Sequence, residues 1–155
     1  MTLPAELQHR LDLAHSHLVL EDIDPAAAVH LACDLLVAGQ DGPATKILAG
    51  HSARTLTAVD AQPLLADFFT ELAHPAPDPR QAARLVTTDL AAKLAAGTLD
   101  ANPGAHRLLG AMAETGDEPG VRELIGLLDR LADQQGRPDE QLQAEFRRFA
   151  ATLAT

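Results

Sequence analysis

The chain has 155 residues and a formal net charge of −10, from 22 acidic and 12 basic residues. This length suits one domain, or two small halves packed together. Nucleic acids and anionic membranes both attract basic surfaces, so the charge argues against either as a partner. The single cysteine, Cys33, excludes an internal disulfide, and we expect it to be a buried, inert thiol.

Alanine and leucine dominate the composition, with 30 and 26 residues, and both favour helix. Residues that favour strands are few: the chain has three isoleucines, four phenylalanines, no tyrosine and no tryptophan. The sequence therefore predicts a single all-α domain over 1–155, a compact bundle or array of about seven to eight short helices.

Four helices are predicted in the first half. The first runs from Pro4 to about residue 20, and the second begins with Asp24 as cap and Pro25 in the first turn. Gly39 ends the second helix. A short third helix spans 43–49, and a fourth begins with Asp60 as cap and ends near residue 73. The residues expected to face the core of the second and third helices are Val29, Ala32, Cys33, Leu36, Val37, Ile47 and Leu48.

The segment 74–79 holds three prolines at alternating positions and is predicted to be extended and stiff. It is a possible subdomain boundary between an acidic helical half, 1–74, and a second half, 79–155. The charge changes at the same place: residues 1–78 carry 11 acids and three bases, whereas residues 79–155 carry 11 acids and nine bases.

Four more helices are predicted in the second half, from Pro79 to Gly97, over about 103–115, from Asp117 to about 135, and over about 138–154. Their predicted core residues are Ala83, Val86, Leu90, Leu94, Leu108, Leu109, Met112, Val121, Leu124, Ile125, Leu128, Leu131, Leu142, Phe146, Phe149 and Leu153. Each half contains a long helix, a glycine corner and a shorter helix that begins at a proline. An ancient duplication, and with it a helical-repeat architecture, stays open on this pattern.

The seven histidines raise the question of a metal site. Asp12-x-x-His15 and Glu71-x-x-His74 have the carboxylate–x–x–histidine spacing of di-iron helical bundles, which need two such motifs and two further carboxylates. A structural zinc site needs four ligands, and His30-x-x-Cys33 supplies only two. We therefore expect no metal and no cofactor, with the histidines in solvent.

The sequence contains no recognisable catalytic constellation. Ser16 and Ser52 are the only serines, and neither lies in a Gly-x-Ser-x-Gly turn. Gly104 and Gly110 have no phosphate-loop context. We therefore predict that the protein is not an enzyme. The N-terminus lacks the features of a signal peptide and no apolar run could span a membrane, which predicts a cytoplasmic protein.

Two stretches of the sequence carry motifs that resemble those of a known family. The first, 32–50, contains Leu-Val-x-Gly, x-Asp-x-Pro-Ala and Leu-Ala-Gly. The second, 92–108, contains Gly97-Thr98-Leu99-Asp100, followed by Gly104-Ala105. In this respect the chain resembles a family of small, uncharacterised all-helical proteins of high-GC Gram-positive bacteria. The second stretch departs from the family pattern at Asn102 and Pro103, where an aromatic residue and an acid are usual. The resemblance implies a helical fold and no assigned function.

Three functions stay open. The leading hypothesis is a protein–protein interaction module, an adaptor or an immunity-type protein that binds a basic protein through Glu21, Asp22 and Asp24. Phe146 and Phe149 in the last helix either complete the core or form a docking or homodimer surface. The alternative is a helical bundle that binds an apolar small molecule, with its mouth near 97–103. A metal-dependent enzyme that uses His15 or His74 comes third.

Overall fold

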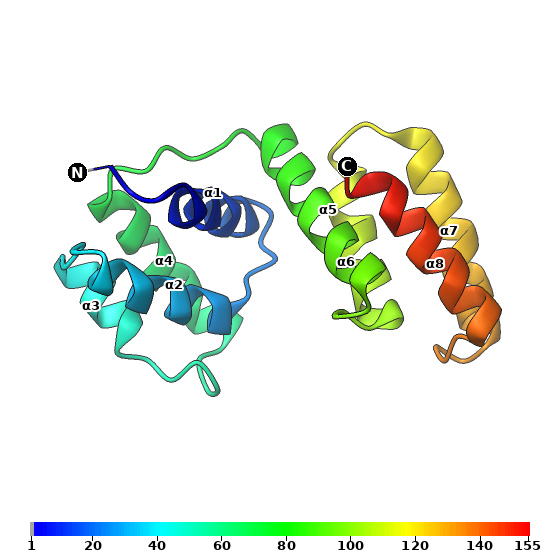
Figure 1. Ribbon diagram of the computed structural model, residues 1–155, viewed down its shortest axis with the longest axis horizontal. Coiled ribbons are helices and arrows are strands. Elements are labelled where there is room, and N and C mark those ends of the chain that lie inside the picture. The colour runs from blue at the N-terminus through cyan, green and yellow to red at the C-terminus, as the bar shows by residue number, and fades with distance from the viewer. Residues whose placement is uncertain (1) are drawn as a thin grey trace. The chain divides into compact units, whose positions relative to one another are not determined.

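The computed structural model describes residues 2–155, and these form eight α-helices with no strand among them (Figure 1). The predicted all-α fold is confirmed. The helices are α1 (Ala5–Val19), α2 (Pro25–Val37), α3 (Pro43–Ala49), α4 (Ala58–Glu71), α5 (Pro79–Ala96), α6 (Ala101–Ala113), α7 (Glu118–Asp133) and α8 (Glu140–Leu153).

The chain divides into two units, one ending at Ala82 and the other spanning Ala83–Thr155. Unit 1 contains α1 to α4 and the first turn of α5, and unit 2 contains the rest of α5 with α6, α7 and α8. The division falls inside α5, a few residues after the extended segment 74–78, which the sequence singled out by its alternating prolines.

Side-chain caps account for most helix starts. The carboxylates of Asp24, Asp117 and Asp139 accept hydrogen bonds from backbone N–H groups in the first turns of α2, α7 and α8. The start of α4 differs from the prediction, because the hydroxyl of Thr57 is the cap and accepts the N–H of Asp60 at 3.1 Å. A hydroxyl three residues earlier competes successfully with a carboxylate that then lies in the first turn, where the helix dipole also favours it.

Helix α6 begins two residues earlier than predicted, at Ala101. Pro103 therefore lies within the first turn, where a missing N–H leaves no intrahelical bond unmade. Pro103 was predicted to be the first residue of this helix, but a proline is also accepted as the third residue of the first turn.

The core of unit 1 is built by α1, α2, α3 and α4, with α2 in contact with the other three. The buried face of α2 is only partly the predicted one, with Val29 and Ala32 buried as predicted. Ala28, Leu31, Ala32 and Leu35 are buried at helical spacing, while Val37 is 89% exposed. Val37 follows Leu35 by two residues, about 200° around the helix, so both side chains cannot lie on one face. On α2 the same shift leaves Cys33 and Leu36 partly exposed, and on α3 the predicted core residue Ile47 is 55% exposed.

In unit 2, α6 contacts α7 and α8, and α7 contacts α8. The predicted core residues of α5 are all buried. On α7 the buried residues are Leu124, Leu127 and Leu131, whereas Ile125 is 43% exposed. The prediction therefore placed the apolar stripe of α7 slightly too far around the helix. Phe146 and Phe149 of α8 are both buried, which supports the core interpretation of the two that the sequence left open.

Candidate ligand pocket and a buried histidine chain

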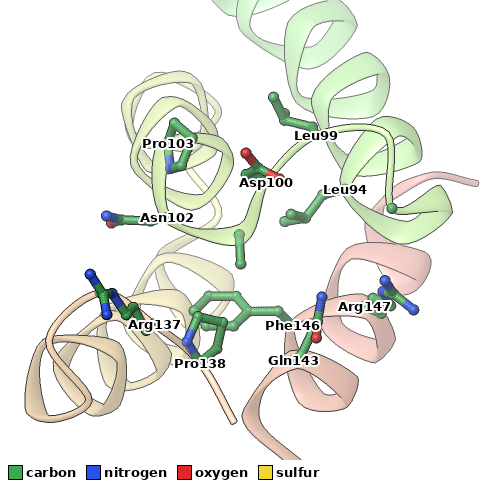
Figure 2. A pocket seen from close by; sticks show the side chains of 13 residues that line it. Leu94, Leu99, Asp100, Asn102, Pro103, Arg137, Pro138, Gln143, Phe146 and Arg147 are labelled. Atoms are coloured by element: carbon green, nitrogen blue, oxygen red, sulfur yellow. The ribbon is translucent and has the colours of Figure 1, made fainter. Parts of the chain in front are cut away.

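A pocket of about 420 Å³ lies within unit 2 (Figure 2). Four pieces of chain enclose it: the end of α5, the α5–α6 corner with the first turn of α6, the α7–α8 connection, and α8. The full set of lining residues is Leu94, Gly97, Leu99, Asp100, Ala101, Asn102, Pro103, Gly136, Arg137, Pro138, Gln143, Phe146 and Arg147. The corner 97–103, which the sequence analysis named as the mouth of a hypothetical ligand site, forms one wall.

Apolar and polar side chains both line the pocket. Phe146 is fully buried and Leu94 is 3% exposed, so both belong to the core of unit 2 as well as to the pocket. Leu99 and Pro138 are partly buried and complete the apolar surface. Figure 2 shows the Phe146 ring next to Pro138. Apolar groups held in place by core packing are the usual lining of a small-molecule site.

The rim of the pocket is polar and carries two cations. Arg137 and Arg147 lie on different sides of the pocket in Figure 2, with Gln143 between them on the α8 side. Both arginines are exposed, and neither guanidinium forms an ion pair with a residue that the structure describes. Asp100 is the one acid in the lining, so the rim carries a net charge of +1 in a chain whose net charge is −10.

Two glycines with left-handed backbone allow polar side chains to lie over the rim. Gly97 has φ +77°, and a Cβ added to it would lie 3.0 Å from Nη2 of Arg147. Gly136 has φ +75°, and its added Cβ would lie 3.0 Å from Nδ2 of Asn102. Each glycine thus permits both a turn and a close approach that a larger residue would hinder. The side chains of α6 and α8 are thereby positioned at the mouth.

The second arrangement is a chain of three polar side chains in unit 1. Nδ1 of His15 lies 2.7 Å from Nδ1 of His74, and Nε2 of His74 lies 2.8 Å from Oδ1 of Asp12. The His15 ring also stacks on Phe69 of α4, with 3.9 Å between ring centroids and 3° between planes. His15 is only 7% exposed. The expectation of solvated histidines is therefore wrong for His15 and His74, and also for His17, which is buried against the turn after α1.

The hydrogen bonds determine where protons lie in this chain. Asp12 accepts a hydrogen bond from His74 Nε2–H, and the bond between the two Nδ1 atoms needs one N–H and one lone pair. Burial lowers the pKa of His15 below its ordinary value, the charge of a protonated His74 lowers it further, and the Asp12 carboxylate opposes both effects. His15 is therefore kept neutral to a lower pH than a solvated imidazole.

Glu71 does not join this cluster, although the sequence placed it in a motif with His74. Its carboxylate accepts the backbone N–H groups of Ala44 at 2.7 Å and Thr45 at 3.0 Å, together with the Thr45 hydroxyl at 2.8 Å. Desolvation alone would raise the pKa of Glu71, but these three hydrogen bonds outweigh it and the net pKa is lowered. Glu71 of α4 thus caps the N-terminus of α3. Gly42, the residue before α3, has no side chain that could accept these N–H groups.

No group of three or more histidine, cysteine, aspartate or glutamate side chains among residues 2–155 has the geometry of a metal site. Of the two carboxylate–x–x–histidine motifs, the structure brings together Asp12, His15 and His74 and separates Glu71 from them. In the Asp12–His15–His74 group, hydrogen bonds already occupy both nitrogens of His74.

The acids proposed for partner binding lie together between α1 and α2. Glu21 is exposed, the carboxylate of Asp22 lies 3.4 Å from Nδ1 of His17, and Asp24 caps α2 through its side chain. Two of the three acids therefore have a role in the local structure, which leaves Glu21 as the residue whose charge is most available.

Sequence reasoning did not find the pocket residues Arg137 and Arg147. They come from different segments, about ten residues apart, and no local motif links them to 97–103.

No described helix is both long and apolar enough to cross a membrane. Comparison with protein-family models, with curated proteins and with solved structures yields no match for the chain. The resemblance to the helical family of high-GC Gram-positive bacteria stays a prediction.

Proposed function

We propose that the protein is a small-molecule-binding protein and that the pocket of unit 2 is its binding site. The observation that carries this proposal is the pocket of about 420 Å³, which is lined by apolar residues and by a polar rim with two arginines. This volume lies within the roughly 300–1,000 Å³ of typical ligand sites, which combine apolar walls with a few polar groups. The pocket holds no pair of side chains arranged as nucleophile and base, so we propose binding rather than catalysis.

The chemistry of the rim defines the class of ligand. Arg137 and Arg147 bring positive charge from two sides, and the first turn of α6 adds the positive end of its dipole. Leu99 and Pro138, the partly exposed apolar residues of the lining, suit a hydrocarbon or aromatic body. The ligand is therefore an organic anion with an apolar body and a carboxylate or phosphate head. This modifies the alternative drawn from sequence, which expected an apolar small molecule.

Two matched probes test the proposal: octanoate, which has an anionic head, and octan-1-ol, which has a neutral head and the same chain length. Each is titrated into the ¹⁵N-labelled protein, and backbone amide shifts are followed by NMR. We expect octanoate to produce saturable shifts at Leu94, Leu99 and Ala101, with weaker binding of octan-1-ol. Saturable shifts elsewhere with none at these amides would refute the proposal.

Arginine variants test the role of charge in the same titration. Arg137→Gln and Arg147→Gln should each weaken octanoate binding about 1.4- to fivefold, because an exposed charge pair contributes ~0.2–1 kcal/mol. Neither change should alter octan-1-ol binding. Arg148→Gln is the matched control, since Arg148 is the exposed neighbour on α8 and does not line the pocket. If the Arg148 variant weakened octanoate binding as much as the other two variants, the effect would come from the overall charge of the protein and not from arginines that line the pocket.

Binding of a basic protein to the acidic surface of unit 1 is the second proposal, and the net charge of −10 supports it. Glu21→Lys reverses an exposed charge without removing the cap of α2. It should slow the association of a basic partner at low salt and have little effect at high salt. The measurement is the association rate of a partner captured from the source organism, in both salts.

A further inference from the structure

We propose that Asp12, His74 and His15 form an acid-sensitive latch, which holds α1 against the C-terminal end of α4 and opens when both imidazoles are protonated. This inference is independent of the pocket, because every residue of the latch lies in unit 1.

The latch connects parts of the chain that are far apart in sequence. Asp12 and His15 lie one helical turn apart on α1, and His74 follows the end of α4, 59 residues after His15. Stacking of His15 on Phe69 adds an apolar contact between the same two helices. The polar bonds and the stack therefore add to the core packing of Leu11 in holding α1 against α4.

Acid opens the latch because the bond between the two imidazoles depends on how many protons they carry. With both imidazoles neutral, His74 donates its Nε2–H to Asp12, and His15 donates its Nδ1–H to the Nδ1 lone pair of His74. One added proton is tolerated, because the Nδ1–Nδ1 bond still has one donor and one acceptor. A second added proton leaves two N–H groups and two positive charges face to face at 2.7 Å. The hydrogen bond is then lost, and like charges separate.

Other charged groups around α1 do not neutralise the pair. Those that act on His15 are His74 and Asp12, and Asp12 also accepts a hydrogen bond from Gln8 at 3.1 Å. On α2, Asp34 pairs with Arg10 of α1 at 2.6 Å. On α4, Glu71 is bonded to α3. A single carboxylate therefore faces two imidazoles, and it can compensate only one positive charge.

Amide hydrogen exchange in the intact chain tests the latch. We expect protection factors of the α1 amides, corrected for intrinsic exchange, to fall between pH 7.5 and 5.0, with a slope of up to tenfold per pH unit, because the open state binds one more proton. His15→Asn retains an N–H donor but cannot be protonated, so α1 should lose most of this pH dependence. His9→Asn, an exposed position on the same helix, should leave it unchanged.

A measurement on the unmodified protein guards against a variant that folds poorly. Imidazole ¹⁵N and ¹³C shifts report the protonation of His15 in the folded chain and in 8 M urea. His15 should titrate at lower pH in the folded chain, and α1 amides should shift in the same pH range. Equal titration of His15 in both conditions, or protection of α1 that does not vary between pH 7.5 and 5.0, overturns the proposal.

Discussion

Two glycines of α6 give a sharp test of how packing opposes helix propensity. Replacing a helical glycine with alanine favours the helix by about 1 kcal/mol, because glycine loses more backbone entropy on folding. Gly110 is exposed, and a Cβ there meets nothing within 4 Å. Gly104 is buried, and its Cβ would lie 2.9 Å from Cγ of Leu99 and 3.3 Å from Cδ1 of Leu94.

The two substitutions should therefore have opposite signs. Gly110→Ala should stabilise the protein by about 1 kcal/mol. At Gly104 the added methyl group displaces two pocket-lining leucines, and overpacking of this kind costs ~1–3 kcal/mol, more than the gain in propensity. Gly104 also lies in the first turn of α6, where propensity counts for less. We expect Gly104→Ala to destabilise unit 2 by about 1 kcal/mol and to weaken octanoate binding.

Thermal unfolding followed by circular dichroism at 222 nm measures both effects. For a unit of this size, 1 kcal/mol shifts Tm by roughly 4–8 °C. Gly110→Ala should raise Tm and Gly104→Ala should lower it. If Gly104→Ala raised Tm as much as Gly110→Ala, the close approach of α6 to Leu94 and Leu99 would be refuted, and with it the shape of the pocket wall.

Three further predictions concern stability. Phe146→Ala should cost ~3–5 kcal/mol in urea unfolding because its ring is fully buried, and unchanged stability would contradict that position. Glu71→Ala should cost about 1 kcal/mol by removing the cap of α3, and Glu71→Gln should recover part of this loss as judged by Tm. Acid should act in two stages in a pH series of urea midpoints. The pKa of His15 is lowered on folding, so its contribution to the free energy of unfolding is present above pH ~6.5 and is lost as the pH falls. The pKa of Glu71 is also lowered, so the stability that it contributes is lost as the pH falls below ~4.3. Glu71→Gln should remove only this second stage.

Local signals in the sequence were sufficient for the helices. Asp24 followed by Pro25, and Asp117 before Glu118, mark helix starts through contacts within three or four residues. Such contacts depend only on neighbours in the chain, so they can be predicted without a fold. Small local errors remained at the starts of α4 and α6. The larger error arose where the outcome depends on other helices: the buried face of α2 was misassigned at Val37 because its neighbours α1, α3 and α4 determine which side is covered.

The candidate sites depend on contacts between distant segments. Spacing identified Asp12, His15, Glu71 and His74 as residues of interest, but it could not show that His74 bonds to Asp12 while Glu71 turns to α3. The pocket likewise combines the corner 97–103 with Arg137 and α8.

By itself, the sequence determined an acidic, all-helical chain, most of its helix ends and the absence of recognised catalytic motifs, because composition, capping and proline geometry act over a few residues. Only the tertiary structure decided which faces are buried, which histidines are hydrogen-bonded to one another and where a pocket opens. Those outcomes depend on how helices pack, and helix packing joins side chains that no short stretch of sequence contains.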